Sequence, residues 1–199
     1  MNISRFFVTF YLVLLLLLLN ACSGLTESDK PAISQWWLKP YTSTAQAGDS
    51  GPVLPVAVSI SSVPGLDTDR ILTLSGDAEL GQYASARWVD HAPELFASLL
   101  ERSMRSTGRF VMVSESAATR PGNCHLELEL QEFFAGLGPS GNTSDVSVAV
   151  FGRFQCDNEK PVIIQSAYSV NVAEERMRTI VAAFQRSVDQ VIQDILSKI

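Results

Sequence analysis

Two segments of alternating apolar and polar residues, joined by a glycine-rich stretch, constrain the fold of this chain most strongly. Residues 125–133 read HLELELQEF, and residues 145–156 alternate valines with small or polar residues. A strict period of two predicts strands, and Gly136–Asn142 between them is dense in turn residues. The pair is therefore expected to form a long β-hairpin, with the leucines and Glu132 of its first strand on one face.

Cys124 and Cys156 stand at the outer ends of these two segments. Ser140 lies midway between them, so a symmetric hairpin places the two cysteines directly opposite each other. Directly opposed residues have Cβ atoms about 4.5–5.5 Å apart, which is near the reach of a disulfide. In an oxidising compartment we expect a structural disulfide that closes the open end of the hairpin. Two free, partly buried thiols are the alternative.

The remaining chain predicts two helices and several more strands. Apolar residues at three- and four-residue steps predict amphipathic helices from Pro93 to Gly108 and from about residue 175 to the end. Residues 78–89 fit either a strand or an irregular segment. Alternating patterns predict further strands at 33–39, 53–60, 70–74, 109–113 and 161–172. Two helices packed against a mainly antiparallel or mixed sheet make an α+β two-layer sandwich.

The first twenty-two residues indicate export and lipid attachment. Residues 6–19 are almost wholly apolar, follow Arg5 and lead into Asn20-Ala21-Cys22. A basic start, an apolar core and a small-residue cleavage site are the layout of a secretory signal peptide, and the cysteine makes it typical of a bacterial lipobox. The apolar stretch is shorter than the roughly 20 residues that span a bilayer. We expect acyl chains, palmitate among them, on Cys22; an uncleaved anchor and ordinary secretion are the alternatives.

Cleavage would remove residues 1–21 and leave a tether at 22–32 and one domain at 33–199. Ser23 follows the cysteine, where an aspartate would signal retention at the inner membrane, so the expected location is the outer membrane, facing the periplasm. Because Arg5 is the only charged residue removed, the net charge goes from −6 to −7. Such an acidic chain does not fit binding to nucleic acid, or recruitment to anionic lipid through bulk charge.

Residues that could carry catalysis are sparse. His91 and His125 are not at metal-ligand spacing from each other, and a disulfide would remove the thiolate beside His125. The sequence contains no nucleophile elbow, HExxH pair or Walker loop. Gly136–Gly141 matches a dinucleotide-binding pattern, but a strand-like segment follows it where that motif needs a helix. We therefore expect neither an enzyme nor a metal or cofactor site.

Several short blocks, taken in order, resemble a known family. They are Val63–Asp67 followed by Arg70-Ile71, Glu79-Leu80 with Tyr83, Ala86–Trp88, Gly108–Phe110, Leu126–Phe133 and Ala182–Phe184. Together with the lipobox, this set resembles the ABC-type transport auxiliary lipoproteins over nearly the whole mature chain. Where the first strand of that family usually carries a Tyr-x-Leu pattern, this chain has Trp36-Trp37-Leu38.

The resemblance implies a non-catalytic component of an MCE-type lipid transport system. In such a system an inner-membrane ABC permease and ATPase work with MCE-domain proteins that form a hydrophobic conduit across the periplasm. The auxiliary lipoprotein would dock this conduit at the outer membrane, often as a homo-oligomeric ring. Two alternatives are a free-standing lipoprotein that holds an acyl chain between sheet and helices, and a lipoprotein assembly partner of an outer-membrane β-barrel.

For a docking protein, aromatic residues near loops are the candidate partner contacts: Trp36, Trp37, Tyr83 and Trp88. Trp and Tyr are enriched at the energetic centres of interfaces, although a core position is the alternative for each. Trp36 and Trp37 are adjacent, so on a strand they point to opposite faces. One of them is therefore expected either under another layer or free to meet a partner.

Overall fold

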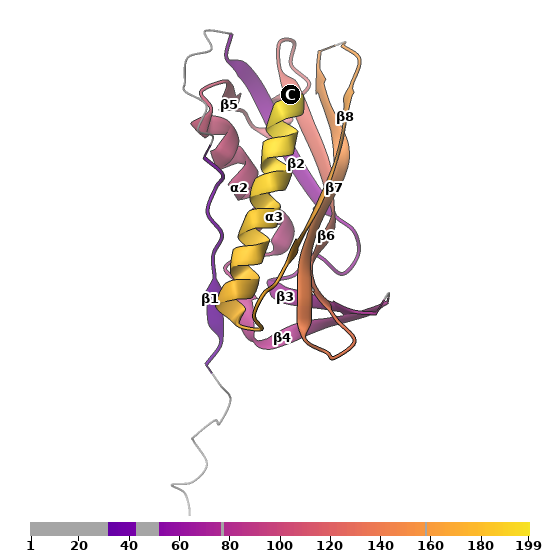
Figure 1. Ribbon diagram of the computed structural model, residues 1–199. Coiled ribbons are helices and arrows are strands. Elements are labelled where there is room, and N and C mark those ends of the chain that lie inside the picture. The colour runs from indigo at the N-terminus through magenta and orange to yellow at the C-terminus, as the bar shows by residue number, and fades with distance from the viewer. Residues whose placement is uncertain (1–31, 43–51, 77, 158) are drawn as a thin grey trace, which may run out of the picture. The chain divides into compact units, whose positions relative to one another are not determined.

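The computed structural model describes residues 32–42, 52–76, 78–157 and 159–199 (Figure 1). The strands are β1 (Ser34–Trp36), β2 (Leu54–Ser62), β3 (Arg70–Ser75), β4 (Glu79–Trp88), β5 (Phe110–Met112), β6 (Cys124–Leu137), β7 (Thr143–Cys156) and β8 (Val162–Asn171). The helices are α2 (Ala92–Ser106), the short 3-10 helix η2 (Glu115–Ala117) and α3 (Met177–Lys198). The segment 78–89, which fits two readings in the sequence, is the strand β4.

The predicted hairpin is the centre of the sheet. β6 and β7 pair antiparallel along their whole length, and β8 pairs antiparallel with the other edge of β7. At the tip, the Gly138 N–H donates to the Asn142 carbonyl (2.8 Å) and the Gly141 N–H donates to the Gly138 carbonyl (2.9 Å). Gly141 has φ +78°, a conformation that glycine adopts without steric cost. The glycine-rich stretch is thus a turn between strands and does not open a helix.

The other edge of β6 is shared by two arms of the sheet. β2 runs parallel to residues 124–130 of β6 and continues to β5, which is parallel to β2. β3 runs parallel to residues 134–137 of β6, and it continues to β4, antiparallel, and then to β1, parallel to β4. All eight strands of the described ranges therefore form one mixed sheet that branches at β6.

A β-bulge at Gln131 lies where β6 changes from one arm to the other. The register with β7 shifts by one residue between Leu130 and Glu132, so Gln131 is the extra residue. An extra residue in a strand exchanges the two faces for every residue that follows. Phe133, which is 1% exposed, is accordingly the next core residue after Leu130. The expectation that Glu132 continues the leucine face is wrong for this reason.

Both helices pack on one face of the sheet. In Figure 1, α3 runs across the front of the sheet and α2 lies beside it. Gly108, with φ +71°, lies just beyond the end of α2 in the left-handed conformation that the sequence predicts. The buried stripe of α2 consists mainly of Leu95, Phe96, Leu99, Leu100 and Met104. That of α3 consists mainly of Ile180, Val181, Phe184, Val188, Val191, Ile192, Ile195 and Leu196.

Three aromatic rings fill the middle of the core. Trp88 from β4 lies 4.9 Å from Phe184 of α3 and 5.5 Å from Phe133 of β6, measured between ring centroids. The two phenylalanine rings are 5.1 Å apart. The layers of sheet and helices are therefore joined by direct packing, which confirms the predicted α+β sandwich. Within the described ranges, no helix combines the length and the apolar character needed to cross a membrane.

Candidate functional site

The side of the sheet that faces away from the helices carries exposed apolar side chains. Phe151 of β7 is 43% exposed and Ile163 of β8 is 58% exposed. Both belong to the outward phase of their strands, because Val150 and Ile164 beside them are buried. We call this side the open sheet face. Its hollow has a volume of about 330 Å³ and is lined by Ser61, Glu127, Glu129, Phe151, Arg153 and Ile163, among others.

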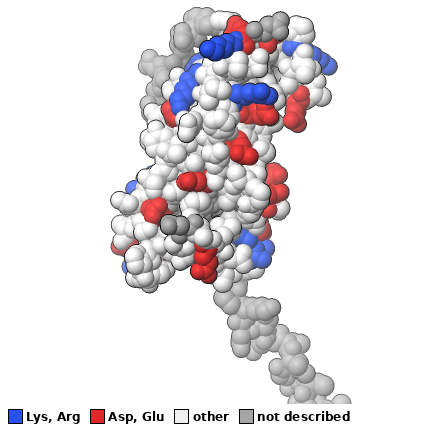
Figure 2. All heavy atoms as spheres, turned by 90° about the vertical axis from the view of Figure 1, so that its right-hand side faces the viewer, with Lys and Arg blue, Asp and Glu red and all other residues white. Residues whose placement is uncertain are grey.

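Charged residues surround this apolar centre. The Arg153 guanidinium binds the Glu127 carboxylate across β6 and β7, with Nε 2.9 Å from Oε2. Glu129 lies opposite Phe151 in the register of the two strands. Figure 2 shows the side of the molecule that includes β8, where acidic side chains are spread from the upper to the lower end and most basic ones lie near the upper end. An apolar centre with a charged rim is the usual composition of a protein interface.

The segment after β1, residues 37–42, lies along the helices and contacts both α3 and α2; we call it the strap. Leu38 is fully buried in the core, whereas its neighbour Trp37 is 64% exposed. The side chain of Gln185 on α3 holds the strap in the manner of a strand partner: Lys39 N–H donates to its Oε1 (2.7 Å) and its Nε2 donates to the Lys39 carbonyl (2.9 Å). The Arg102 guanidinium of α2 lies 5.8 Å from the centre of the Trp37 ring.

The four predicted aromatic contacts have different environments. Trp37 is the most exposed, and Trp36 is partly buried against the core. Tyr83 is also partly buried; its hydroxyl forms a hydrogen bond with Thr143 Oγ1 at the hairpin tip, and burial raises the pKa of its phenol. Trp88 is 1% exposed, so it has no surface to offer a partner and belongs to the core.

Cys124 and Cys156 are joined by a disulfide in the structure. They pair directly in the register of β6 and β7, and their Cα atoms are 4.0 Å apart. Cys124 is buried. The bond closes the open end of the hairpin, far along both strands from the turn, so its position indicates a structural role.

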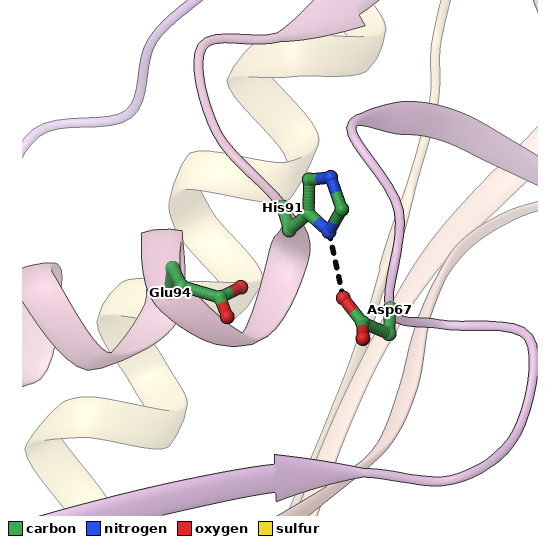
Figure 3. Close-up of side chains that lie close together, drawn as sticks. All are labelled: Asp67, His91 and Glu94. Atoms are coloured by element: carbon green, nitrogen blue, oxygen red, sulfur yellow. Dashed lines mark hydrogen bonds and ion pairs between the residues drawn. The ribbon is translucent and has the colours of Figure 1, made fainter.

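A hydrogen-bonded group at the start of α2 was not apparent in the sequence. His91 Nδ1 donates to Asp67 Oδ1 (2.7 Å), and one ligand-type atom from each of Asp67, His91 and Glu94 lies within 4.8 Å of the others (Figure 3). The hydrogen bond to Asp67 raises the pKa of the His91 imidazole, and the charges of Asp67, Glu94 and Asp69 act in the same direction.

These three side chains are all exposed. The pair of Asp67 and His91 joins the β2–β3 connection to the first residue before α2, and the Ala92 N–H donates to the Thr68 carbonyl (3.0 Å) in support. The geometry is that of a surface ion pair fixing a helix start. Asp67 is 24 residues from His91, so only the His-x-x-Glu spacing of His91 and Glu94 was available as a signal in the sequence.

The open sheet face was also missed, although the sequence carries a signal for it. Val146, Val148 and Val150 define the inward phase of β7, and Phe151 falls in the other phase. A large aromatic residue among outward-facing positions is unusual enough to mark a surface. Cys22 and the expected cleavage site lie outside the described residues.

Comparison with known proteins agrees with this architecture. The chain is similar to the crystal structure of the protein XCC0632 from Xanthomonas campestris, with a TM-score of 0.67 at 13% identity, over 83% of this chain and 92% of that one. It is also similar to the crystal structure of an uncharacterised protein, with a TM-score of 0.65 at 9% identity, over 84% of this chain and 98% of that one. No curated protein matches the chain. At these identities the two structures establish the fold alone.

The family assignment comes from the sequence model of the ABC-type transport auxiliary lipoprotein component, which matches residues 38–196. This range begins at Leu38 in the strap and ends at Leu196 in the last turn of α3, so it includes both layers of the sandwich. The family is one of auxiliary transport components and not a known family of enzymes. The chain therefore belongs to the family of ABC-type transport auxiliary lipoprotein components.

Proposed function

We propose that this protein is a non-catalytic lipoprotein of an MCE-type ABC transport system that moves lipid between membranes. In this account it docks the periplasmic conduit of MCE-domain protein at the outer membrane. The observation that carries the proposal is the family match over residues 38–196, since it links nearly the whole folded domain to ABC-type transport. ATP is consumed by other subunits, so this chain acts by binding and positioning.

Attachment through Cys22 is the first part of this function. Three acyl chains on the mature N-terminus would make dissociation from the membrane negligible, because each buried methylene adds about 0.8 kcal/mol. Residues 22–32 would then join the lipid to a domain that starts at residue 33. Eleven residues reach at most about 36–40 Å when fully extended. The start of the domain would therefore stay within this distance of the membrane.

The open sheet face is the surface that we propose for the conduit. Phe151 and Ile163 offer exposed apolar area at its centre, and Glu127, Glu129 and Arg153 form a charged rim. A tethered protein meets its partner at a raised effective concentration, so a modest interface of this kind is sufficient. Several copies could surround one conduit, which is how a homo-oligomeric ring would form.

Packing of the core is relevant to the alternative of a lipid carrier. That alternative needs room for an acyl chain between sheet and helices, where Trp88, Phe133 and Phe184 are in mutual contact. The rings occupy the middle of this space, which favours the docking role.

Two measurements test the proposal. The full-length chain with a C-terminal tag is expressed in its native cells, crosslinked, and purified from the membranes, and the captured proteins are identified by mass spectrometry. Recovery of an MCE-domain protein with its permease and ATPase is expected; recovery of an outer-membrane barrel protein without them, or of this chain with bound lipid alone, would contradict the docking role.

A Cys22→Ser variant should lose palmitate incorporation and outer-membrane fractionation.

A further inference from the structure

The surface around Trp37 combines an exposed indole with two cations. Trp37, which immediately precedes the core residue Leu38, is 64% exposed, and Ile33 is 50% exposed. A hollow of about 440 Å³ beside the indole is lined by Trp37, Lys39, Pro40, Thr42 and Arg102. The surface formed by Trp37, Lys39 and Arg102 is called the Trp37 surface below.

The backbone around Trp37 is fixed. The residue after Trp37, Leu38, is completely buried. The residue before it, Trp36, belongs to β1 and pairs with Trp88 of β4. The Val89 N–H donates to the Trp36 carbonyl (3.1 Å), and Gln185 holds Lys39 through two hydrogen bonds. Because its neighbours on both sides are held, Trp37 cannot turn into the core without breaking these contacts. Its indole is presented outward by the fold.

The Trp37 surface lies close in sequence to the expected lipid anchor. Ile33 is eleven residues from Cys22 and Trp37 is fifteen. A chain of fifteen residues spans at most about 50–54 Å, and the first residues of the domain are more tightly restricted than any other part of it. Of the large apolar side chains that are exposed in the described chain, those of Ile33 and Trp37 come nearest to Cys22 in sequence.

The chemistry of this surface matches the boundary between lipid and water. An indole places an apolar ring toward lipid and a polar N–H toward water, and tryptophan is enriched at this depth of membranes. Lysine and arginine beside it complement the phosphates of lipid headgroups. Bulk charge is not needed, because the acyl chains already supply attachment, and so the net charge of −7 in the mature chain is no obstacle.

We propose that the Trp37 surface rests in the headgroup layer of the membrane that holds the acylated Cys22, so that the domain has a fixed orientation on the bilayer. The inference rests on the proposed lipid anchor. It makes the strap a second contact with the membrane and leaves the open sheet face, which belongs to the opposite side of the sheet from α2, available to the conduit.

Tryptophan fluorescence tests this contact, because the chain contains three tryptophans and the other two, Trp36 and Trp88, are partly or fully buried. The acylated full-length lipoprotein is reconstituted into vesicles of phosphatidylethanolamine and phosphatidylglycerol, with or without lipids brominated near the headgroup. We expect brominated lipid to quench the tryptophan emission. We also expect acrylamide to quench this emission less than half as strongly in vesicles as in detergent. Trp37→Phe should abolish both effects, and Trp36→Phe should retain them.

The other outcomes would contradict either the membrane contact alone or the lipid anchor as well. If the protein sediments with the vesicles and acrylamide still quenches Trp37 as strongly as in detergent, the membrane contact is wrong and the anchor stands. If the acylated protein does not sediment with vesicles, the anchor fails and the contact fails with it. If Trp37 becomes shielded only when solubilised partner proteins are added, the surface binds protein and the membrane contact is overturned.

Discussion

Cys124 and Cys156 face each other at the open end of the β6–β7 hairpin, 32 residues apart in sequence and joined by a disulfide. A crosslink over this separation removes conformational freedom mainly from the unfolded chain. We predict that the double substitution Cys124→Ala and Cys156→Ala lowers the free energy of unfolding by about 2–4 kcal/mol, measured by urea denaturation.

Reduction offers the matched control for this pair. The unsubstituted protein in reductant should unfold at the same urea concentration as the double variant, and reductant should not change the variant further. Equal midpoints for the oxidised protein and the variant would show that the bond does not stabilise the fold.

Gly152 permits an unusually close approach of β7 to β6. A Cβ atom at this position would lie 2.0 Å from the Glu127 carbonyl oxygen and 2.8 Å from the Leu128 Cα, both of them backbone atoms that cannot move aside. Gly152→Ala should therefore destabilise the protein by about 3 kcal/mol or more. Gly138→Ala is the control, since its Cβ would meet nothing closer than 3.6 Å. Equal thermal unfolding temperatures for the two variants would show that the close approach at Gly152 is not needed.

Leu38 and Trp37 are neighbours with opposite environments. Leu38→Ala removes a fully buried side chain and should cost about 2–5 kcal/mol of folding free energy. Trp37→Ala removes a mostly exposed ring and should change stability by less than about 1 kcal/mol. Chemical denaturation of both variants checks this difference, and a larger loss for Trp37→Ala would mean that the strap is not seated as described.

The stabilisation that the His91–Asp67 pair contributes should depend on pH. The hydrogen bond to Asp67 raises the pKa of His91 in the folded protein above the value of about 6.5 for an unfolded histidine. The stabilisation by this pair is thus fully present below the unfolded pKa, and it is lost as the pH rises through the higher folded-state value.

NMR titration measures this shift directly, because the chain has two histidines and His91→Gln identifies the signal by its loss. In Asp67→Asn the midpoint of His91 should move down toward the ordinary value. An unchanged midpoint in that variant would rule out Asp67 as the main cause.

The sequence predicts that Cys124 lies opposite Cys156, and the structure shows how the register of the hairpin brings this about. The hairpin has two irregularities, one that adds a residue to β6 at Gln131 and one, between Gly136 and Leu137, that adds a residue to β7. They cancel, so the register from Leu130 back to Cys124 is that of a symmetric hairpin. The bulge at Gln131 could not be predicted, because it lies where β6 exchanges β2 for β3 as its partner. That exchange is a long-range property of the sheet.

The aromatic residues show the same limit. Adjacency alone requires Trp36 and Trp37 to point in opposite directions, but which one is exposed depends on how Leu38 and Gln185 hold the strap. In the sequence, Trp88 lies in a segment that fits a strand, and nothing beside it indicates burial. It is buried because Phe184 of α3, nearly one hundred residues later in the chain, packs against it. Local patterns therefore predict the elements, and contacts between distant elements decide which side chains reach the surface.

Site-specific photocrosslinking can show whether the open sheet face contacts the MCE conduit in cells. A photoreactive residue replaces Ile163 in the full-length lipoprotein in native cells, and a matched one replaces Gln193, which is exposed on α3. We expect an adduct with an MCE-domain protein from position 163 and none from position 193. Adducts of equal yield at both positions, or no adduct with any transport component at position 163, would contradict it.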